Sequence, residues 1–174
     1  VPDGGPIEAH TDLVKKLDYE CELAVVLGKD ARDVPAGQTR DYIFGYTILN
    51  DVSARDVQTA HKQWYFGKSL DGFTPIGPCI VTADAFADYP PRLGIRSFVN
   101  GEKRQDSNTA LQIFDIDHVI AELSQGMTLK AGTIIATGTP AGVGMGMDPP
   151  QFLKPGDVVR CEIEGIGTLT NPVK

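Results

Sequence analysis

Two glutamates, Glu20 and Glu22, stand at alternate positions in the segment YECELAVVLG, residues 19 to 28, just before it becomes wholly apolar. Successive side chains of a strand point to opposite faces, so these two carboxylates share one face and repel each other. Water would screen the repulsion on an exposed face, whereas an enclosed face would need a cation between them. The unbroken run from Ala24 to Leu27 favours a strand that is buried on both faces. We therefore weigh a cation site against the simpler alternative of a solvated glutamate pair.

Asp51 is the natural third carboxylate, because it ends a second predicted strand, IFGYTILND, residues 43 to 51. The following segment begins at Ser53, which we expect to cap a helix over residues 53 to 64 that aims Asp51 inward. Oxygen-only ligation suits Mg²⁺, Mn²⁺ or Ca²⁺, and three carboxylates leave positions open for water or substrate, as a catalytic Mg²⁺ or Mn²⁺ site requires. Calcium alone is less expected, since the sequence contains no EF-hand loop pattern.

Two glycine-containing loops offer further polar groups. The loop GKSLDGFTPIGP, residues 67 to 78, carries Lys68 and Asp71, and the helix after Asp51 should return it to the same end of the sheet. Lys68 is the candidate cation, with a solvated surface lysine as the alternative. The segment TGTPAGVG, residues 137 to 144, could offer backbone N–H groups and the Thr139 hydroxyl to a carboxylate, with a plain glycine turn as the alternative.

The remaining patterns predict a β-rich α+β fold of short strands. Further strands are expected at residues 79–83, in a hairpin over 93–105 that turns at Asn100-Gly101, at 133–136, and as a pair over 156–173. A helix is predicted over residues 115–126, with Asp115 as its N-cap and Gly126 as its stop. Because no repeat or linker interrupts residues 1–174, we expect one domain.

Composition narrows the class of protein. The chain has 16 basic and 23 acidic residues, and a net charge of −7 disfavours nucleic acid or an anionic membrane as partner. Apolar runs are too short to cross a bilayer and no signal-peptide pattern is present, so we expect a cytoplasmic protein. The spacing of the cysteines fits no zinc or redox motif, and we expect them to be buried free thiols: Cys21, Cys79 and Cys161. The histidines also lack the spacing of a zinc site: His10, His61 and His118.

Five segments together resemble the fumarylacetoacetate hydrolase family in order and spacing, from about Leu17 to Thr170: LDYECELAVVLGK, GYTILNDVSARDVQ, QWYFGKSLDGFTPIGP, VNGEKRQDSNT and ATGTPAGVG. The resemblance implies a mixed β-sandwich roll, a homodimer, and a catalytic domain that holds Mg²⁺ or Mn²⁺ through Glu20, Glu22 and Asp51. It also implies that Lys68 sits beside the metal and that Thr139 helps to bind a substrate carboxylate, and we expect both residues to be catalytic. The residues implied or suggested to bind substrate are Arg55, Gln58, Asp71 and Thr139.

The implied reaction is hydrolysis of a carbon–carbon bond in an acylpyruvate, a 2,4-dioxo acid, with the metal as a Lewis acid and Lys68 stabilising an enolate. Oxaloacetate decarboxylation, or isomerisation of an oxo-diacid such as 2-hydroxyhepta-2,4-diene-1,7-dioate, could use the same site. Only hydrolysis needs a general base that activates water. Related hydrolases are expected to carry a His and Glu pair on a lid upstream of the Glu-x-Glu strand, and the residues before Leu17 show no matching segment. We expect the lid upstream of the sequence shown, or a different base.

A non-catalytic, metal-stabilised binding domain is the alternative from a different class. Such a scaffold would have no need of a cation at Lys68 or a carboxylate-binding segment at Thr139 beside its metal, so those residues favour an enzyme.

Overall fold

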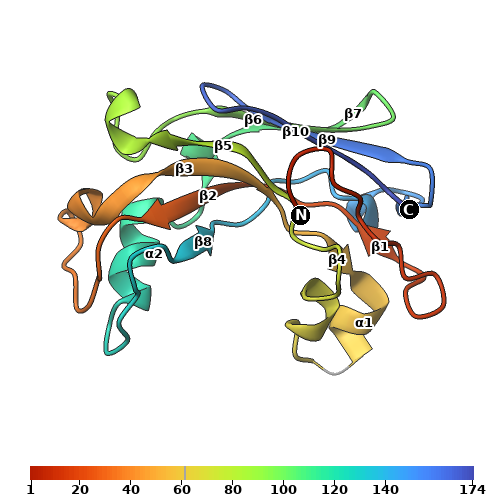
Figure 1. The fold of residues 1–174 in the computed structure, drawn as a ribbon, viewed down its shortest axis with the longest axis horizontal. Helices are drawn as coiled ribbons and strands as arrows, with labels where there is room; N and C mark the ends of the chain where they lie inside the picture. Colours follow the sequence, from red (N-terminus) through yellow and green to blue (C-terminus); the bar gives the residue numbers. More distant parts are fainter. Residues whose placement is uncertain (61) are drawn as a thin grey trace.

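Residues 1–60 and 62–174, which the computed structural model describes, form two four-stranded sheets that stack face to face (Figure 1). The order in one sheet is β5 (Ile76–Thr82), β3 (Ile43–Asn50), β2 (Cys21–Leu27) and β8 (Ile134–Ala136). In the other it is β10 (Gly167–Pro172), β9 (Val158–Ile163), β6 (Gly94–Val99) and β7 (Glu102–Asn108). Neighbouring strands within both sheets are antiparallel. The predicted β-rich α+β class is confirmed.

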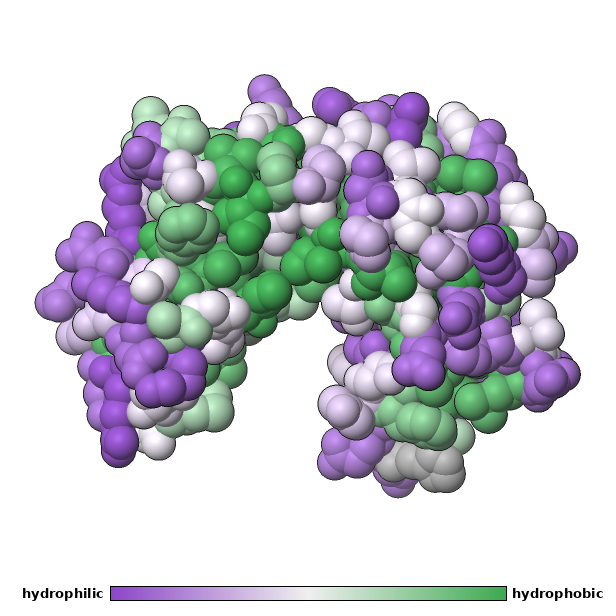
Figure 2. Space-filling view, viewed as in Figure 1, coloured by the Kyte–Doolittle hydropathy of each residue, from purple (hydrophilic) through white to green (hydrophobic). Residues whose placement is uncertain are grey.

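Smaller elements flank the two sheets. The short strands β1 (Leu17–Asp18) and β4 (Ser53–Ala54) pair beside helix α1 (Arg55–Ala60), and helix α2 (Ile116–Leu123) lies near β8. A wide notch separates the side of the molecule that carries α1 from the side that carries α2 (Figure 2). Apolar residues gather in the roof of this notch and on its α2 side. In the described part of the chain, no helix combines the length and apolar character needed to cross a membrane.

Strand β2 is buried on both of its faces, as its apolar run predicts. Cys21, Leu23 and Val25 are at most 1% exposed and belong to the hydrophobic core between the sheets. On the opposite face Glu22 is only 3% exposed, and Glu20, just before the strand, is 8% exposed. The solvated glutamate pair is therefore excluded, because water does not cover this face.

The register between β2 and β3 brings Asp51 to the glutamates. Cys21 pairs with Asn50 and Glu22 with Leu49, so the residue after β3 arrives beside the residue before β2. The Asp51 N–H donates to the Glu20 carbonyl oxygen over 2.9 Å, and the Asn50 side chain accepts from the Glu20 N–H over 3.0 Å. The backbone itself thus fixes the distance between these carboxylates.

Turn and cap chemistry agrees with the sequence at two further elements. Asn100 and Gly101 both have positive φ, 52° and 83°, which is the backbone of the predicted two-residue hairpin turn between β6 and β7. The Asp115 carboxylate accepts from the His118 N–H over 2.8 Å at the start of α2. Both predictions are confirmed.

Three details of the sequence reading are wrong. Ser53 does not cap α1, because it belongs to β4, where it pairs with Asp18 of β1, and its hydroxyl donates to the Asp51 carbonyl oxygen. Strand β5 begins at Ile76 rather than at residue 79, since the start of this strand pairs with β3 within the predicted loop. Cys79 is exposed rather than buried, because it lies on this edge strand; Cys21 and Cys161 are buried free thiols as expected.

Candidate metal and substrate site

Three carboxylates converge where β2 begins and β3 ends. Ligand oxygens of Glu20, Glu22 and Asp51 all lie within 4.8 Å of one another. Two of these side chains retain some access to solvent, 11% for Glu20 and 20% for Asp51. The structure therefore assembles the three predicted ligands into one partly open cluster of oxygen atoms, the donor set that Mg²⁺ and Mn²⁺ prefer.

Lys68 lies directly on this cluster. Its Nζ donates to Glu20 Oε2 over 2.9 Å, to Ser53 Oγ over 3.0 Å, and to Asp51 Oδ2. The lysine ends a 3₁₀ turn, Phe66–Lys68, that packs closely against α1. A Cβ at Gly67 would lie 2.6 Å from the Gln58 backbone nitrogen, so only glycine permits this approach. The surface-lysine alternative is excluded by this placement.

Arg55, at the start of α1, is a second buried cation. Its side chain is 5% exposed; Nη1 lies 2.7 Å from Glu20 Oε1, and Nε donates to Asp18 Oδ2 over 2.9 Å. The same Nη1 donates to Gln58 Oε1 over 3.3 Å, so the two residues of the RDVQ segment face one another. Arg55 thus binds Glu20, one of the three clustered carboxylates, together with Asp18 and Gln58.

The glycine-rich segment after β8 contacts the other glutamate. The Gly138 N–H donates to Glu22 Oε2 over 2.8 Å, and the Thr139 hydroxyl donates to the Cys21 carbonyl oxygen over 2.9 Å. The fully buried Gln105 of β7 donates to Thr139 Oγ1 over 2.8 Å. Because the Thr139 hydroxyl proton is committed to Cys21, a carboxylate at this segment would have to be bound by backbone N–H groups instead.

Burial and mutual repulsion shape the electrostatics of the cluster. Burial raises the pKa of Glu22 from its usual 4.5 to about 7, against the opposing Gly138 hydrogen bond, and the charges of Asp51 and Glu20 add to the rise. Burial also raises the pKa of Asp51. For Lys68 burial favours a lower pKa, but hydrogen bonds to Asp51 and Glu20 outweigh it and raise the pKa, so the ammonium stays charged.

The charge balance of these groups fits a divalent cation. When all are ionised, four carboxylates, those of Asp18, Glu20, Glu22 and Asp51, face two cations, Arg55 and Lys68. The excess of two negative charges in a largely buried site is costly unless it is neutralised. Oxygen-only donors with this excess match a hard divalent ion and not a thiolate- or imidazole-bound metal.

Other predicted or noted residues lie outside the cluster. Asp71 is exposed, and its side chain is not part of the cluster of Glu20, Glu22 and Asp51. Its backbone carbonyl oxygen contacts His10 Nε2 at 2.7 Å. Its role in substrate binding stays a prediction. His118, which lies on α2, stacks on Phe114 with 4.7 Å between the ring centroids. His61 lies outside the described residues.

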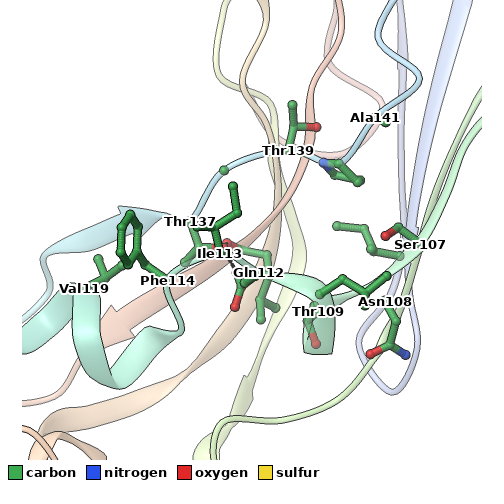
Figure 3. Close-up of a pocket in the computed structure, with 15 residues that line it drawn as sticks. Ser107, Asn108, Thr109, Gln112, Ile113, Phe114, Val119, Thr137, Thr139 and Ala141 are labelled. Atoms are coloured by element: carbon green, nitrogen blue, oxygen red, sulfur yellow. Dashed lines mark hydrogen bonds between the residues drawn. The ribbon is translucent and has the colours of Figure 1, made fainter.

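A cavity of about 450 Å³ opens beside the glycine-rich segment (Figure 3). In Figure 3, Phe114 and Val119 lie at one end of this cavity, Ser107 and Asn108 lie at the other, and Thr139 lies along its upper edge between them. Its lining includes Leu23, which points into the core. Residues 137–141 line this cavity, and the Gly138 N–H among them also donates to Glu22 of the carboxylate cluster.

The model of the fumarylacetoacetate (FAA) hydrolase C-terminal family matches residues 1–174. The chain belongs to the fumarylacetoacetate hydrolase family. Oxaloacetate tautomerase YisK of Bacillus subtilis is 48% identical over 170 residues, which cover 98% of this chain and 56% of that protein. The chain thus spans about half the length of the curated relatives it matches.

Solved structures of the family superpose closely. A fumarylacetoacetate hydrolase from Exiguobacterium antarcticum matches with a TM-score of 0.97 and 52% identity, over 100% of this chain and 62% of that one. A 2-hydroxyhepta-2,4-diene-1,7-dioate isomerase from Mycobacterium marinum matches with a TM-score of 0.88 and 44% identity, over 99% and 64% of the two chains. Members of the family are therefore enzymes of several kinds, including a tautomerase, a hydrolase and isomerases.

Two buried polar residues that contact the site in this family member are absent from the sequence-based prediction. Asp18 accepts from Arg55, and Gln105 connects the backbone of Cys21 to Thr139. Both stand inside segments that carry the family resemblance, LDYECELAVVLGK and VNGEKRQDSNT. Asp18 stands between Leu17 and Tyr19, which was a local signal of burial, whereas Gln105 stands between the charged residues Arg104 and Asp106 and gave no such signal.

Proposed function

We propose that this chain is the catalytic part of an enzyme that uses Mg²⁺ or Mn²⁺ to form an enolate from a small 2-oxo acid. The observation that carries the proposal is the buried carboxylate cluster with Lys68 on it, because a scaffold that only needed metal for folding would not need the ammonium there. Glu20, Glu22 and Asp51 would hold the ion. When bound, it would supply Lewis-acid stabilisation of negative charge on a substrate oxygen.

The chain's own groups have separate roles in this proposal. The Lys68 ammonium stays protonated beside two carboxylates, so it stabilises a developing enolate oxygen or gives it a proton, and it does not act as a base. Arg55 and Gln58 would contact the substrate's oxygens from α1. Backbone N–H groups around Thr139 would bind a substrate carboxylate, since the hydroxyl proton of Thr139 is already donated to Cys21.

Among enolate reactions, tautomerisation or isomerisation of an oxo-diacid fits the described residues best. Tautomerisation moves a proton from carbon 3 to the 2-oxygen, so it needs a base other than the protonated Lys68 to accept the carbon 3 proton, but no water has to be activated. Support comes from the names of the B. subtilis tautomerase and the M. marinum isomerase. Decarboxylation of oxaloacetate would instead break the bond between carbons 3 and 4, release carbon dioxide and leave the enolate of pyruvate.

Hydrolysis of an acylpyruvate is the second candidate. It is favoured by the close match to the E. antarcticum protein, which is named as a fumarylacetoacetate hydrolase. This reaction needs a general base that activates water. Such a base would have to come from outside the cluster of carboxylates and Lys68 described here.

One set of assays separates these reactions. Metal-stripped full-length protein is supplied with Mg²⁺ or Mn²⁺ and tested for loss of enol absorbance from oxaloacetate, pyruvate release from oxaloacetate, and pyruvate release from acetylpyruvate. We expect metal-dependent tautomerisation that Glu22→Gln abolishes and the exposed control Glu122→Gln retains. Pyruvate from acetylpyruvate would establish the hydrolase instead. Tight metal binding without any turnover would support a non-catalytic binding domain.

We also propose that the protein is a homodimer, as the family resemblance implies. Three apolar side chains between β7 and α2 support this: Leu111, Ile113 and Phe114 are 75%, 93% and 59% exposed. Such a cluster beside the cavity in Figure 3 is typical of a surface that another chain covers. Light scattering should give a dimeric mass that Ile113→Glu lowers. A monomeric wild-type protein would refute the dimer, and a dimeric Ile113→Glu would refute this interface.

A further inference from the structure

Asp18 is a fully buried carboxylate that is not one of the proposed metal ligands. It is 0% exposed and stands two residues before Glu20, in strand β1. Burial of a lone carboxylate is costly, and a residue of this kind is kept where its charge and its acceptors are used. Its partners therefore indicate what it does.

Four donors converge on the two Asp18 oxygens. Oδ2 accepts from Arg55 Nε and from the Met145 N–H, both over 2.9 Å. Oδ1 accepts from the Tyr19 N–H over 2.9 Å and from the Gly144 N–H over 2.7 Å. Charge-assisted bonds from fixed backbone groups leave the carboxylate with one orientation. Asp18 is thus a rigid anchor shared by Arg55 and the end of the glycine-rich segment.

The Arg55 guanidinium is planar, so two fixed nitrogens determine the third. Asp18 holds Nε, and Glu20 together with Gln58 holds Nη1. Nη2 is buried and has no hydrogen-bond partner among the described residues. A buried donor without an acceptor is unfavourable, and at a substrate site it indicates that a ligand supplies the acceptor.

We propose that Asp18 is a positioning residue for substrate binding: it orients Arg55 so that Nη2 is free to donate to an oxygen of a bound oxo acid. The role rests on the proposed function. Asp18 acts on the substrate only through Arg55, and the Gly144 and Met145 N–H groups hold the Asp18 carboxylate itself in place. The backbone there is tightly packed, since a Cβ at Gly144 would lie 2.8 Å from Asp18 Oδ1 and 1.9 Å from the Gln151 carbonyl oxygen.

A double-mutant cycle tests this coupling. Asp18→Asn keeps the shape of the side chain but removes the charge and turns one acceptor into a donor that faces N–H groups. In full-length, Mg²⁺-loaded protein, calorimetry measures affinity for oxalate, a planar dianion that chelates a metal as a 2-oxo acid would. We expect Asp18→Asn and Arg55→Gln each to weaken oxalate binding at least tenfold, and the double variant to lose no more than Arg55→Gln alone. The KM for oxaloacetate should rise in parallel.

Two results would overturn the role of Asp18. One is an additive loss in the double variant, and the other is an Asp18→Asn protein that melts earlier but binds oxalate as wild type does. If Asp18→Asn does not fold, Arg55→Lys is the substitute, because it keeps the charge but cannot present two adjacent nitrogens. Oxalate affinity must then fall at least tenfold, and an unchanged affinity would contradict the proposal.

Different results would overturn the proposed function and the role of Asp18. Wild-type protein that binds neither Mg²⁺ nor oxalate would overturn the proposed function and this role together. Wild-type protein that binds oxalate with Mg²⁺ but converts no oxo acid would overturn only the reaction, and the cycle would still decide the coupling. The exposed Glu122→Gln variant serves as the matched control throughout.

Discussion

The side chain of Gln105, in β7 of one sheet, donates a hydrogen bond of 2.8 Å to the Thr139 hydroxyl, which follows β8 of the other sheet. Gln105 also accepts from the Cys21 N–H over 3.2 Å. One amide thus ties the Glu-x-Glu strand to the glycine-rich segment. A further bond from its Nε2 reaches the Pro140 carbonyl oxygen over 2.8 Å. The relative placement of Glu22 and Gly138 depends on this amide, because each lies next to a residue that Gln105 contacts.

Replacing Gln105 by leucine should therefore harm both the fold and the metal site. The change leaves the buried Cys21 N–H and the Pro140 carbonyl oxygen without their partner, at a cost of about 2–4 kcal/mol in the free energy of unfolding. Urea unfolding measures the loss, and Mg²⁺ titration should show weaker binding. Gln125→Leu, at an exposed residue just after α2, is the control. Wild-type stability in Gln105→Leu would refute this view of the amide.

The raised pKa of Glu22 makes the metal-free protein sensitive to pH. Because the folded state raises this pKa from 4.5 to about 7, it favours the protonated carboxyl. The contribution is fully present below pH 4.5 and is lost as pH rises to about 7, a change of about 3 kcal/mol at most. Wild-type protein should lose more stability than Glu22→Gln across this window when both are free of metal. Parallel curves for the two proteins would contradict the assignment.

The same proton competes with the metal. Mg²⁺ affinity should rise up to tenfold per pH unit as Glu22 ionises, and level off above about pH 7. Titration of Mg²⁺ at several pH values measures the slope. A flat profile between pH 5.5 and 7 would show that no carboxyl with a raised pKa binds the ion.

Lys68→Met should separate metal binding from turnover. Lys68 shares Glu20 and Asp51 with the ion, so removing its charge should leave Mg²⁺ affinity equal or higher. Turnover of oxaloacetate should fall by about 10² or more, because the charge that stabilises the enolate is gone. Lys130→Met, at an exposed lysine paired with Asp30, is the matched control. Weaker Mg²⁺ binding together with full turnover would contradict both parts.

Much of the site was accessible from the sequence because it depends on strand geometry. Alternation places Glu20 and Glu22 together, and a strand end places Asp51, without any knowledge of how the sheets stack. Lys68 follows from a short helix that returns its loop. Asp18 and Gln105 depend instead on which strands and loops pack against β2, and no local pattern carries that information.

The errors have the same origin. The sequence makes Ser53 a good helix cap, but pairing between β1 and β4 places it in a strand. Its hydroxyl there accepts from Lys68 and donates to the Asp51 carbonyl oxygen. Cys79 looks buried among apolar neighbours, yet β5 is an edge strand, which only the order of the sheet reveals. Long-range pairing decided both outcomes.

The most direct test of the whole account is binding of Mn²⁺ to metal-stripped full-length protein, followed by its paramagnetic resonance signal. We predict one tight site in the wild-type protein and in Glu122→Gln. Affinity should fall at least a hundredfold in Glu20→Gln, Glu22→Gln and Asp51→Asn, which each remove one charged oxygen donor from the cluster. Wild-type affinity in all three variants would contradict the central claim that these carboxylates hold a divalent ion.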